Sequence, residues 1–193
     1  MTSTIMNGIQ KRQNPNDVIY TPDSIVDLML EFCDYKAGQK VLDPCRGKGA
    51  FYNKLSEPKS YCEIEENIDF FDCKEHYDII VGNPPYSMIT KWLDHTMKIC
   101  NKFCYVIGMY SLTPVRLKKM EENGFHITKI LLTQIPSWFM RSYILVVEKG
   151  EKKPITFDYK NLGNKCLYCG RPSGGMKNMK HCKRKATDSE CSY

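Results

Sequence analysis

The amino-acid sequence predicts an α/β fold: a doubly wound, mostly parallel sheet with an antiparallel terminal hairpin, followed by a small C-terminal tail. Two observations lead to this prediction. Short apolar segments alternate with segments of helical periodicity along most of the chain, which is the pattern of strand–helix–strand units. The last two apolar segments follow each other without room for a helix between them, so we expect them to pair antiparallel.

The first half of the chain begins with a predicted helix in YTPDSIVDLMLEFCDY, where Pro22 stands near the start and apolar residues recur at helical spacing (Ile25, Leu28, Met29 and Phe32). QKVLDP is a short strand that ends at Asp43. CRGKGAFYNKL is interpreted as a glycine-bearing turn that leads into a helix. SYCEIEE, NIDFFD and HYDIIVG are interpreted as three strands.

The second half continues the alternation. SMITKWLDHTMKICNKF is a predicted helix whose apolar side contains Ile89, Trp92, Leu93 and Met97. FCYVIGMY is interpreted as a buried strand, and VRLKKMEENG as a helix closed by Gly124. HITKILLTQI and RSYILVVEKG are the two strands of the terminal hairpin. The sequence turns polar after Gly150, so we expect a main domain over 14–150, a linker over 151–164 and a tail over 165–193.

The composition indicates whether the chain is folded and where in the cell we expect it. A hydrophobic content of 42% is near the globular average, which argues against global disorder. The chain has no run of 18 apolar residues, and its first residues lack the apolar core of a secretory signal. We therefore expect an intracellular protein with no membrane partner.

Positive charge is concentrated near the C-terminus. The net charge is +6, yet residues 165–185 contain seven basic residues and no acidic one, which leaves 21 basic and 22 acidic residues elsewhere. Such a segment is attracted to phosphate backbones or acidic surfaces. The sequence therefore predicts a nucleic-acid partner, and the alternative is a solvated polar tail.

The ten cysteines fall into two groups. Six of them are interpreted as small buried hydrophobes in a reducing compartment (Cys33, Cys45, Cys62, Cys73, Cys100 and Cys104). In the tail, Cys166 and Cys169 have the Cys-x2-Cys-Gly spacing of a zinc knuckle, and Cys182 and Cys191 complete a predicted Zn²⁺ site in which His181 can replace one thiolate. A disordered basic tail with incidental cysteines is the alternative.

The segment from Asp43 to Phe51 has the layout of a nucleotide- or nucleoside-binding turn, because glycines let the backbone approach a ligand. Glu63 follows 20 residues after Asp43, where a carboxylate can accept hydrogen bonds from both hydroxyls of a ribose. Asp69 and Phe70 end the next predicted strand and suit an adenine ring. Leu42 and Gly49 occupy places that a phosphate-binding P-loop would give to Gly and to Ser or Thr, and the third Gly of a dinucleotide site is absent.

The stretch IIVGNPPYS is interpreted as a buried strand that stops at an amide, two prolines and an aromatic ring. Pro84 and Pro85 fix φ and withhold N–H donors, so the backbone carbonyl is held in place without a competing local partner. Tyr86 offers a flat face for stacking. A simple strand stop is the structural alternative.

These motifs resemble those of a known family. VLDPCRGKGAF resembles motif I of S-adenosylmethionine-dependent methyltransferases, and NPPY resembles the catalytic motif of their adenine-N6 branch. DVIYTPDSIVDLM is similar to the N-terminal helix motif of adenine methyltransferases in which the cofactor motif precedes the catalytic one. The compact segment from Tyr61 to Ser87 resembles short phage- and virus-type members. The resemblance covers roughly residues 14–150 and implies a Rossmann-like fold.

The resemblance implies methyl transfer from S-adenosyl-L-methionine to the N6 amine of adenine in DNA, with the base flipped into the NPPY pocket. Asn83, Pro84, Pro85 and Tyr86 are the implied catalytic residues, and the Asn83 side-chain oxygen and the Pro84 carbonyl each accept one amine hydrogen. The implied cofactor residues are Tyr20, Thr21, Pro22, Asp43, Pro44, Gly47, Gly49, Phe51, Glu63, Asp69, Phe70 and Asn83.

Substrate contacts are implied less directly. In the family an aromatic residue before the last strand clamps the extruded base, which suggests Trp138 or Phe139, with Arg141 available for a phosphate; the alternative is an aromatic pair packed under the hairpin. Arg46 and Lys48 stand where larger members have a cysteine and a glycine. Two cations beside a sulfonium cofactor are unfavourable unless they point to solvent or to a nucleic-acid phosphate, and we expect both to face a phosphate.

Two other functions remain open. An RNA methyltransferase also fits, because NPPY serves RNA amines as well and the basic tail suits RNA as well as DNA. A non-catalytic nucleic-acid-binding or partner subunit is the rival of another class. For a virus-type member we expect the cytoplasm or another compartment of the host cell.

Overall fold

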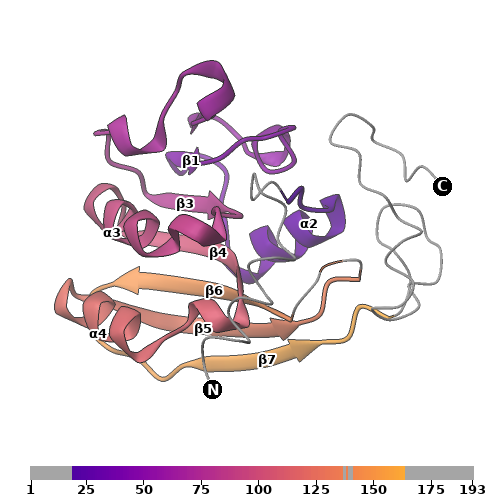
Figure 1. The fold of residues 1–193 in the computed structure, drawn as a ribbon, viewed down its shortest axis with the longest axis vertical. Coiled ribbons are helices and arrows are strands. Elements are labelled where there is room, and N and C mark those ends of the chain that lie inside the picture. The colour runs from indigo at the N-terminus through magenta and orange to yellow at the C-terminus, as the bar shows by residue number, and fades with distance from the viewer. Residues whose placement is uncertain (1–18, 137, 139–140, 164–193) are drawn as a thin grey trace.

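The computed structural model describes residues 19–136, 138 and 141–163, and these form the predicted doubly wound, mostly parallel sheet (Figure 1). The strand order is β2-β1-β3-β4-β6-β5-β7. The strands are β1 (Val41–Asp43), β2 (Lys59–Tyr61), β3 (Ile79–Gly82), β4 (Lys102–Gly108), β5 (Phe125–Thr133), β6 (Ser142–Lys149) and β7 (Thr156–Lys160). The α-helices described are α2 (Asp23–Phe32), α3 (Ile89–Ile99) and α4 (Pro114–Glu122).

The strand directions confirm the antiparallel hairpin. β1 pairs parallel with both β2 and β3, and β3 pairs parallel with β4. β6 runs antiparallel to β5 and also to β4, so it lies between them. The C-terminal ends of β1, β2, β3 and β4 therefore meet at one edge of the sheet, where ligands of open α/β sheets bind.

Helices cover both faces of the sheet. On one face, α3 and α4 pack on alternate strand residues in a core cluster that includes Leu42, Ile80, Phe103, Tyr105 and Leu145. On the other face, α2 packs on the intervening residues, including Val41, Ile79, Val81, Cys104 and Val146. This alternation is the period-two pattern of strands buried on both faces.

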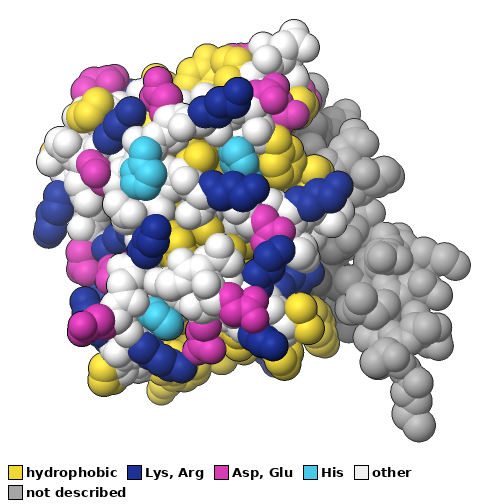
Figure 2. All heavy atoms as spheres, turned by 90° about the vertical axis from the view of Figure 1, so that its left-hand side faces the viewer, with side chains coloured by type: hydrophobic (Ala, Val, Ile, Leu, Met, Phe, Trp, Pro, Cys, Tyr) yellow, Lys and Arg dark blue, Asp and Glu magenta, His cyan; other side chains and the backbone are white. Residues whose placement is uncertain are grey.

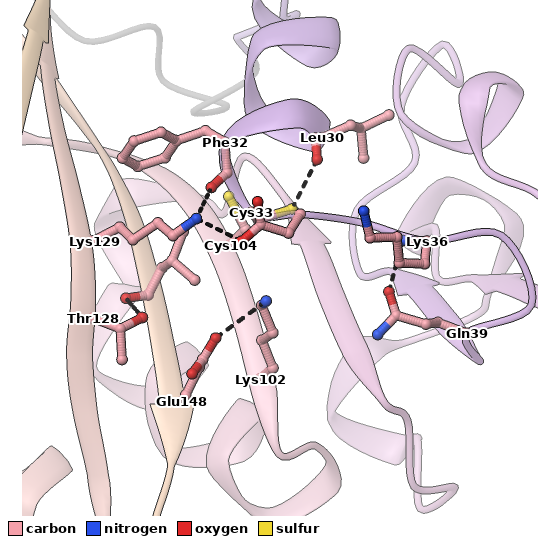
Figure 3. Close-up of polar contacts among 12 residues, drawn as sticks. Leu30, Phe32, Cys33, Lys36, Gln39, Lys102, Cys104, Thr128, Lys129 and Glu148 are labelled. Atoms are coloured by element: carbon pink, nitrogen blue, oxygen red, sulfur yellow. Dashed lines mark hydrogen bonds and ion pairs between the residues drawn. The ribbon is translucent and has the colours of Figure 1, made fainter. Parts of the chain in front are cut away.

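The C-terminal end of α2 is fastened to β5 (Figure 3). The ammonium group of Lys129 donates to the carbonyl oxygen of Phe32 at 3.1 Å and to the carboxylate of Asp34 at 2.5 Å. A cation at this position also complements the negative end of the helix dipole. The N-terminal segment that follows residue 19 is thereby held against the sheet.

Three local predictions were wrong. The glycine turn leads into a 3-10 helix at Tyr52–Lys54 instead of an α-helix. NIDFFD forms no strand; a 3-10 helix spans Phe70–Asp72, and the Asp69 carboxylate accepts the backbone N–H of Phe71 at 2.9 Å. The predicted linker contains β7, which pairs parallel with β5.

The surface of the described domain has mixed charge. Figure 2 shows Lys and Arg side chains interspersed with Asp and Glu over the face where α3 and α4 lie. The six cysteines of the described residues are free thiols; four of them are buried as predicted, whereas Cys45 and Cys73 are only half-buried. Among the helices described, none has the length and apolar character to cross a membrane.

Candidate active site

Asp43 organises the glycine turn from inside the protein. Its side chain has no exposed surface, and its two oxygens accept the backbone N–H groups of Cys45 at 3.3 Å and Tyr52 at 3.1 Å. Burial raises the pKa of this carboxyl to about 7, against the lowering effect of the two N–H donors. Asp43 was predicted to contact a cofactor, but the structure makes it the residue that holds both ends of the turn.

The glycine turn lies against Tyr20 and Glu63. Gly47 has a φ of +52°, and a Cβ atom there would meet Tyr20 Cε1 at 3.3 Å. Its N–H donates to Oε2 of Glu63 at 2.6 Å, and Oε1 of Glu63 accepts the N–H of Glu65 at 3.2 Å. A carboxylate has about four lone-pair sites, so Glu63 retains acceptor capacity for ligand hydroxyls.

The two sequence motifs are in direct contact. A Cβ atom on Gly82 would lie 3.0 Å from Cδ of Pro44, so any side chain at this position would press the glycine turn away from the end of β3. The Cys45 thiol donates to the backbone carbonyl of Asn83 at 3.2 Å. Burial raises the pKa of Cys45 well above its usual value, which keeps this donor protonated.

Of the two polar atoms in the Asn83 side-chain amide, one has a hydrogen-bond partner among the described residues and the other has none. Its side-chain Nδ2 donates to the carbonyl oxygen of Ile19 at 2.8 Å, which fixes the orientation of the amide. Its Oδ1 is buried and has no hydrogen-bond partner among the described residues. A buried polar atom without a partner is unfavourable by about 1–3 kcal/mol, so an acceptor of this kind points to a ligand.

One cavity of about 750 Å³ joins these features. It lies at the C-terminal edge of the sheet, and nine of the predicted cofactor residues line it: Tyr20, Thr21, Pro44, Gly47, Phe51, Glu63, Asp69, Phe70 and Asn83. Pro85, Arg46 and Lys48 line it as well. Its volume falls within the roughly 300–1,000 Å³ of typical ligand pockets.

Other predicted site residues do not line this cavity, namely Pro22, Gly49, Pro84 and Tyr86 as well as Asp43. The Pro22 carbonyl accepts the first backbone N–H groups of α2, from Ile25 and Val26. Trp138 is only 6% exposed and packs in the core cluster with α2, which is the packed alternative stated above. Arg141 is exposed between β5 and β6. Phe139 and the tail cysteines lie outside the described residues.

An aromatic wall was missed by sequence reasoning. Trp92 of α3 stacks on Phe70 with ring centroids 4.3 Å apart, and both line the cavity beside Phe71. The apolar stripe of α3 identified Trp92 only as a core residue. Other lining residues were also missed (Ile19, Cys45, Ala50, Ile64, Glu65, Ile68, Ser87 and Met88).

No metal site is formed by the part of the chain that the structure describes: it contains no group of three or more His, Cys, Asp or Glu residues arranged around an ion. The predicted zinc ligands all lie in the segment 164–193, outside the described residues. The zinc site therefore stays a prediction from the sequence.

No protein-family model matches the chain, and no curated protein matches it either. Solved structures do. A protein assigned as an RNA methyltransferase from Pyrococcus horikoshii superposes with a TM-score of 0.54 at 18% identity, over 66% of this chain and 81% of its own. The modification subunit of an assigned type I restriction enzyme from Vibrio vulnificus gives a TM-score of 0.62 at 15% identity, over 91% of this chain and 52% of its own.

The M protein of the type I restriction enzyme EcoKI gives a TM-score of 0.56 at 12% identity, over 84% of this chain and 51% of its own. This chain thus spans about half the length of either modification subunit. Identities this low establish the arrangement of the backbone and nothing about chemistry. The chain has the Rossmann-like fold that these methyltransferases share.

Proposed function

We propose that this protein transfers a methyl group from S-adenosyl-L-methionine to the exocyclic amine of a nucleic-acid base, with N6 of adenine in DNA as the first choice. One observation carries the proposal. A single cavity is lined by a glycine turn with a ribose-type carboxylate, Glu63, and by Asn83, whose side-chain oxygen lacks a partner among the described residues.

The cavity fits the proposed cofactor in size and in donor set. Glu63 can accept ribose hydroxyls in addition to the N–H of Gly47, and Asp69 and Phe70 line the same cavity and would contact the adenine ring. The cofactor supplies an activated methyl group. The protein would hold the methyl group and the accepting nitrogen in line. Such alignment of reacting groups can account for roughly 7–11 kcal/mol of barrier reduction.

Asn83 would make the adenine amine, which accepts the methyl group, a better nucleophile. The lone pair of an adenine amine is delocalised into the ring, so the nitrogen must become pyramidal to attack. Asn83 Oδ1 and the Pro84 carbonyl would each accept one amine hydrogen and favour that geometry, as fixed acceptors aimed at developing charge do. No general base is needed before transfer, because the proton can leave to water afterwards.

DNA is preferred over RNA on the order of the motifs, with the cofactor turn before NPPY, and on the resemblance to short phage- and virus-type enzymes. Two of the similar structures are modification subunits of type I restriction enzymes, which supports this choice. RNA is the second candidate, because another similar structure is assigned as an RNA methyltransferase.

The tail adds a further part of the proposal. Residues 165–185 carry the excess positive charge, and Cys166, Cys169, Cys182 and Cys191 have ligand types that suit Zn²⁺. In this proposal the tail supplies affinity for nucleic acid in place of a separate recognition domain.

Methyl transfer from radiolabelled S-adenosylmethionine tests the proposal. Wild-type protein is offered DNA and RNA in parallel, and the digests are resolved for N6-methyladenine. We expect labelled N6-methyladenine from DNA and a loss of about 10²-fold or more in kcat for Asn83→Ala.

Asn101→Ala, which removes an exposed amide beyond the C-terminal end of α3, is the matched control and should keep full activity. Label in RNA alone would select the second candidate. No calorimetric signal with S-adenosylmethionine would favour the non-catalytic rival.

A further inference from the structure

Arg46 lines the cavity, but its guanidinium is already paired with a carboxylate of the protein, in contrast to the expected contact with a nucleic-acid phosphate. Its Nη2 forms an ion pair with Oε1 of Glu66, and its guanidinium lies 4.2 Å from the centroid of the Tyr61 ring. The Tyr61 hydroxyl donates to the other oxygen of Glu66 at 2.9 Å. Arg46, Tyr61 and Glu66 thus form a closed set of contacts in which each member touches the other two.

Glu66 belongs to a short loop, residues 63–68, that we call the acidic loop because it holds Glu63, Glu65 and Glu66. The backbone N–H and carbonyl of Glu63 exchange hydrogen bonds with those of Ile68, at 2.9 Å and 3.1 Å. Asn67 has the left-handed conformation, with φ of 60°, which brings the chain back. The loop is therefore closed at its base and presents its glutamates on a compact turn.

Two hydrogen bonds and one ion pair connect the glycine turn to the acidic loop and the residue before it. The Arg46 N–H donates to the carbonyl oxygen of Cys62 at 2.9 Å, just before the loop begins. The Gly47 N–H donates to the Glu63 carboxylate at 2.6 Å. The Arg46 side chain reaches Glu66 on the other side of the loop. Glu63 is consequently held between two contacts from consecutive residues of the turn.

The ion pair between Arg46 and Glu66 offsets charge repulsion within the acidic loop. Three carboxylates within four residues repel one another, and like charges in proximity destabilise a compact loop. Arg46 neutralises Glu66 and leaves Glu63 and Glu65 toward the cavity, which both line. Both also lie close enough to Tyr20 to help raise its pKa, after the larger effect of burial.

We propose that Arg46, Tyr61 and Glu66 are positioning residues that hold the acidic loop so that Glu63 faces the ribose of the bound cofactor. This inference rests on the proposed function. It assigns Arg46 to the cofactor side of the site and leaves Lys48, whose Nζ lies 5.0 Å from the Tyr20 ring centroid at the cavity, as the cation for a nucleic-acid phosphate.

The expected effect is moderate. Isolated exposed ion pairs contribute little, because two flexible side chains must be ordered in water. Here the guanidinium is stacked on Tyr61 and its carboxylate partner is held by a second donor, so less freedom remains to be lost. We expect a loss of about tenfold in cofactor affinity when the network is broken.

Calorimetry with S-adenosylhomocysteine and steady-state kinetics with nucleic acid test the assignment in the full chain. The variants are Arg46→Ala, Glu66→Ala, their double mutant and Lys48→Ala. Lys118→Ala removes half of an exposed ion pair with Glu122 on α4, away from the cavity, and is the matched control.

Each of the two network variants should raise the Kd of S-adenosylhomocysteine and the KM of S-adenosylmethionine about tenfold, with kcat and the nucleic-acid KM within about twofold. The double mutant should be no worse than either single variant, because the two residues act as one unit. Lys48→Ala should show the reverse split, a raised nucleic-acid KM and an unchanged cofactor Kd.

Additive losses in the double mutant, or an unchanged Kd in Arg46→Ala, would overturn the assignment. So would a raised nucleic-acid KM in Arg46→Ala, which would make Arg46 a phosphate contact. Failure of the wild-type protein to bind S-adenosylhomocysteine would overturn the proposed function itself, and the two failures are therefore distinguishable.

Discussion

A carboxyl group with no exposed surface, Asp43, anchors the turn on which the candidate site is built. The two backbone N–H groups it accepts stabilise its charged form, yet burial dominates and its pKa is about 7. The sequence identified Asp43 as a site residue from its place at the end of a strand. Its structural role could not be predicted, because burial of a strand end depends on what packs over it.

The raised pKa of Asp43 predicts a specific dependence of stability on pH. Between its ordinary value of 3.8 and about 7, the folded protein binds the proton while the unfolded chain has released it. The free energy of unfolding therefore falls as the pH rises through this window, by roughly 4 kcal/mol for this group alone. Asp43→Asn removes that contribution.

Urea denaturation of wild-type and Asp43→Asn proteins between pH 4.5 and 7.5 measures it. The stability of the wild type relative to the variant should decrease steadily with rising pH. A difference that stays constant over the whole range would mean that Asp43 titrates as an ordinary carboxyl group.

Gly82 is the residue that allows the two motifs to touch, and its replacement should separate them. A Cβ atom at 3.0 Å from Pro44 Cδ meets a rigid ring that belongs to the glycine turn, so one strand end must shift. For Gly82→Ala we expect a destabilisation of about 1–3 kcal/mol, as in other overpacked sites, together with a reduced kcat. Denaturation and methyl-transfer assays would show it, and a variant equal to the wild type in both would contradict the close approach.

At the scale of elements, the helices and strands that bury an apolar side were predicted correctly from the sequence. A short segment shaped by local polar contacts was not. α2, α3, α4 and the hairpin strands β5 and β6 follow from apolar periodicity, and all five are present. The stretch around Asp69 was interpreted as a strand from its apolar residues. Its side chain instead caps a 3-10 helix, since Asp competes for backbone N–H groups.

β7 shows the opposite failure. Ile155, Phe157 and Tyr159 alternate with polar residues, which is the period-two pattern of a strand, but the surrounding sequence is polar and the segment was interpreted as a linker. All five strand residues are exposed, so this apolar side is not buried in the domain. It forms through main-chain pairing with β5, from Lys129 opposite Thr156 to Thr133 opposite Lys160. The alternation in its own sequence marks the segment as a strand, but the edge that it joins depends on the neighbouring strand.

The segment between β5 and β6 allows a test of what Trp138 does. Because its side chain is 6% exposed and packs with Ile135 and α2, Trp138→Ala should lower the free energy of unfolding by about 3–5 kcal/mol. Tyr110→Ala, which truncates a ring that is 59% exposed, should change it by less than about 0.5 kcal/mol. If Trp138→Ala kept full stability and lost only base extrusion, measured with 2-aminopurine at the target adenine, Trp138 would be a base clamp.

At the scale of the whole molecule, the site follows from topology. Parallel pairing brings the C-terminal ends of β2, β1 and β3 side by side, so residues that follow them converge from distant parts of the sequence. The order of the motifs along the chain was enough to predict Glu63, Gly47 and Asn83 at one cavity. The contribution of Trp92 could not be predicted, because it depends on how α3 crosses the sheet.

The net positive charge of the chain lies in the C-terminal tail and not in the described domain. Outside residues 165–185 the basic and acidic residues nearly balance, and Figure 2 shows them interspersed on one face of the domain. A nucleic acid bound mainly by the tail releases counterions in proportion to the phosphates that the tail contacts. We therefore predict that replacing Lys183, Arg184 and Lys185 by Gln reduces the slope of log affinity against log salt by about 2–3.

The same charge change made on the described domain, at the exposed Lys74, Lys118 and Lys153, is the control. It should leave the slope nearly unchanged, although both triple variants lower the net charge from +6 to +3. Fluorescence anisotropy of a labelled oligonucleotide over a range of salt concentrations measures both slopes. Equal reductions would mean that net charge alone attracts the nucleic acid, whereas a reduction confined to the tail variant follows from direct phosphate contacts there.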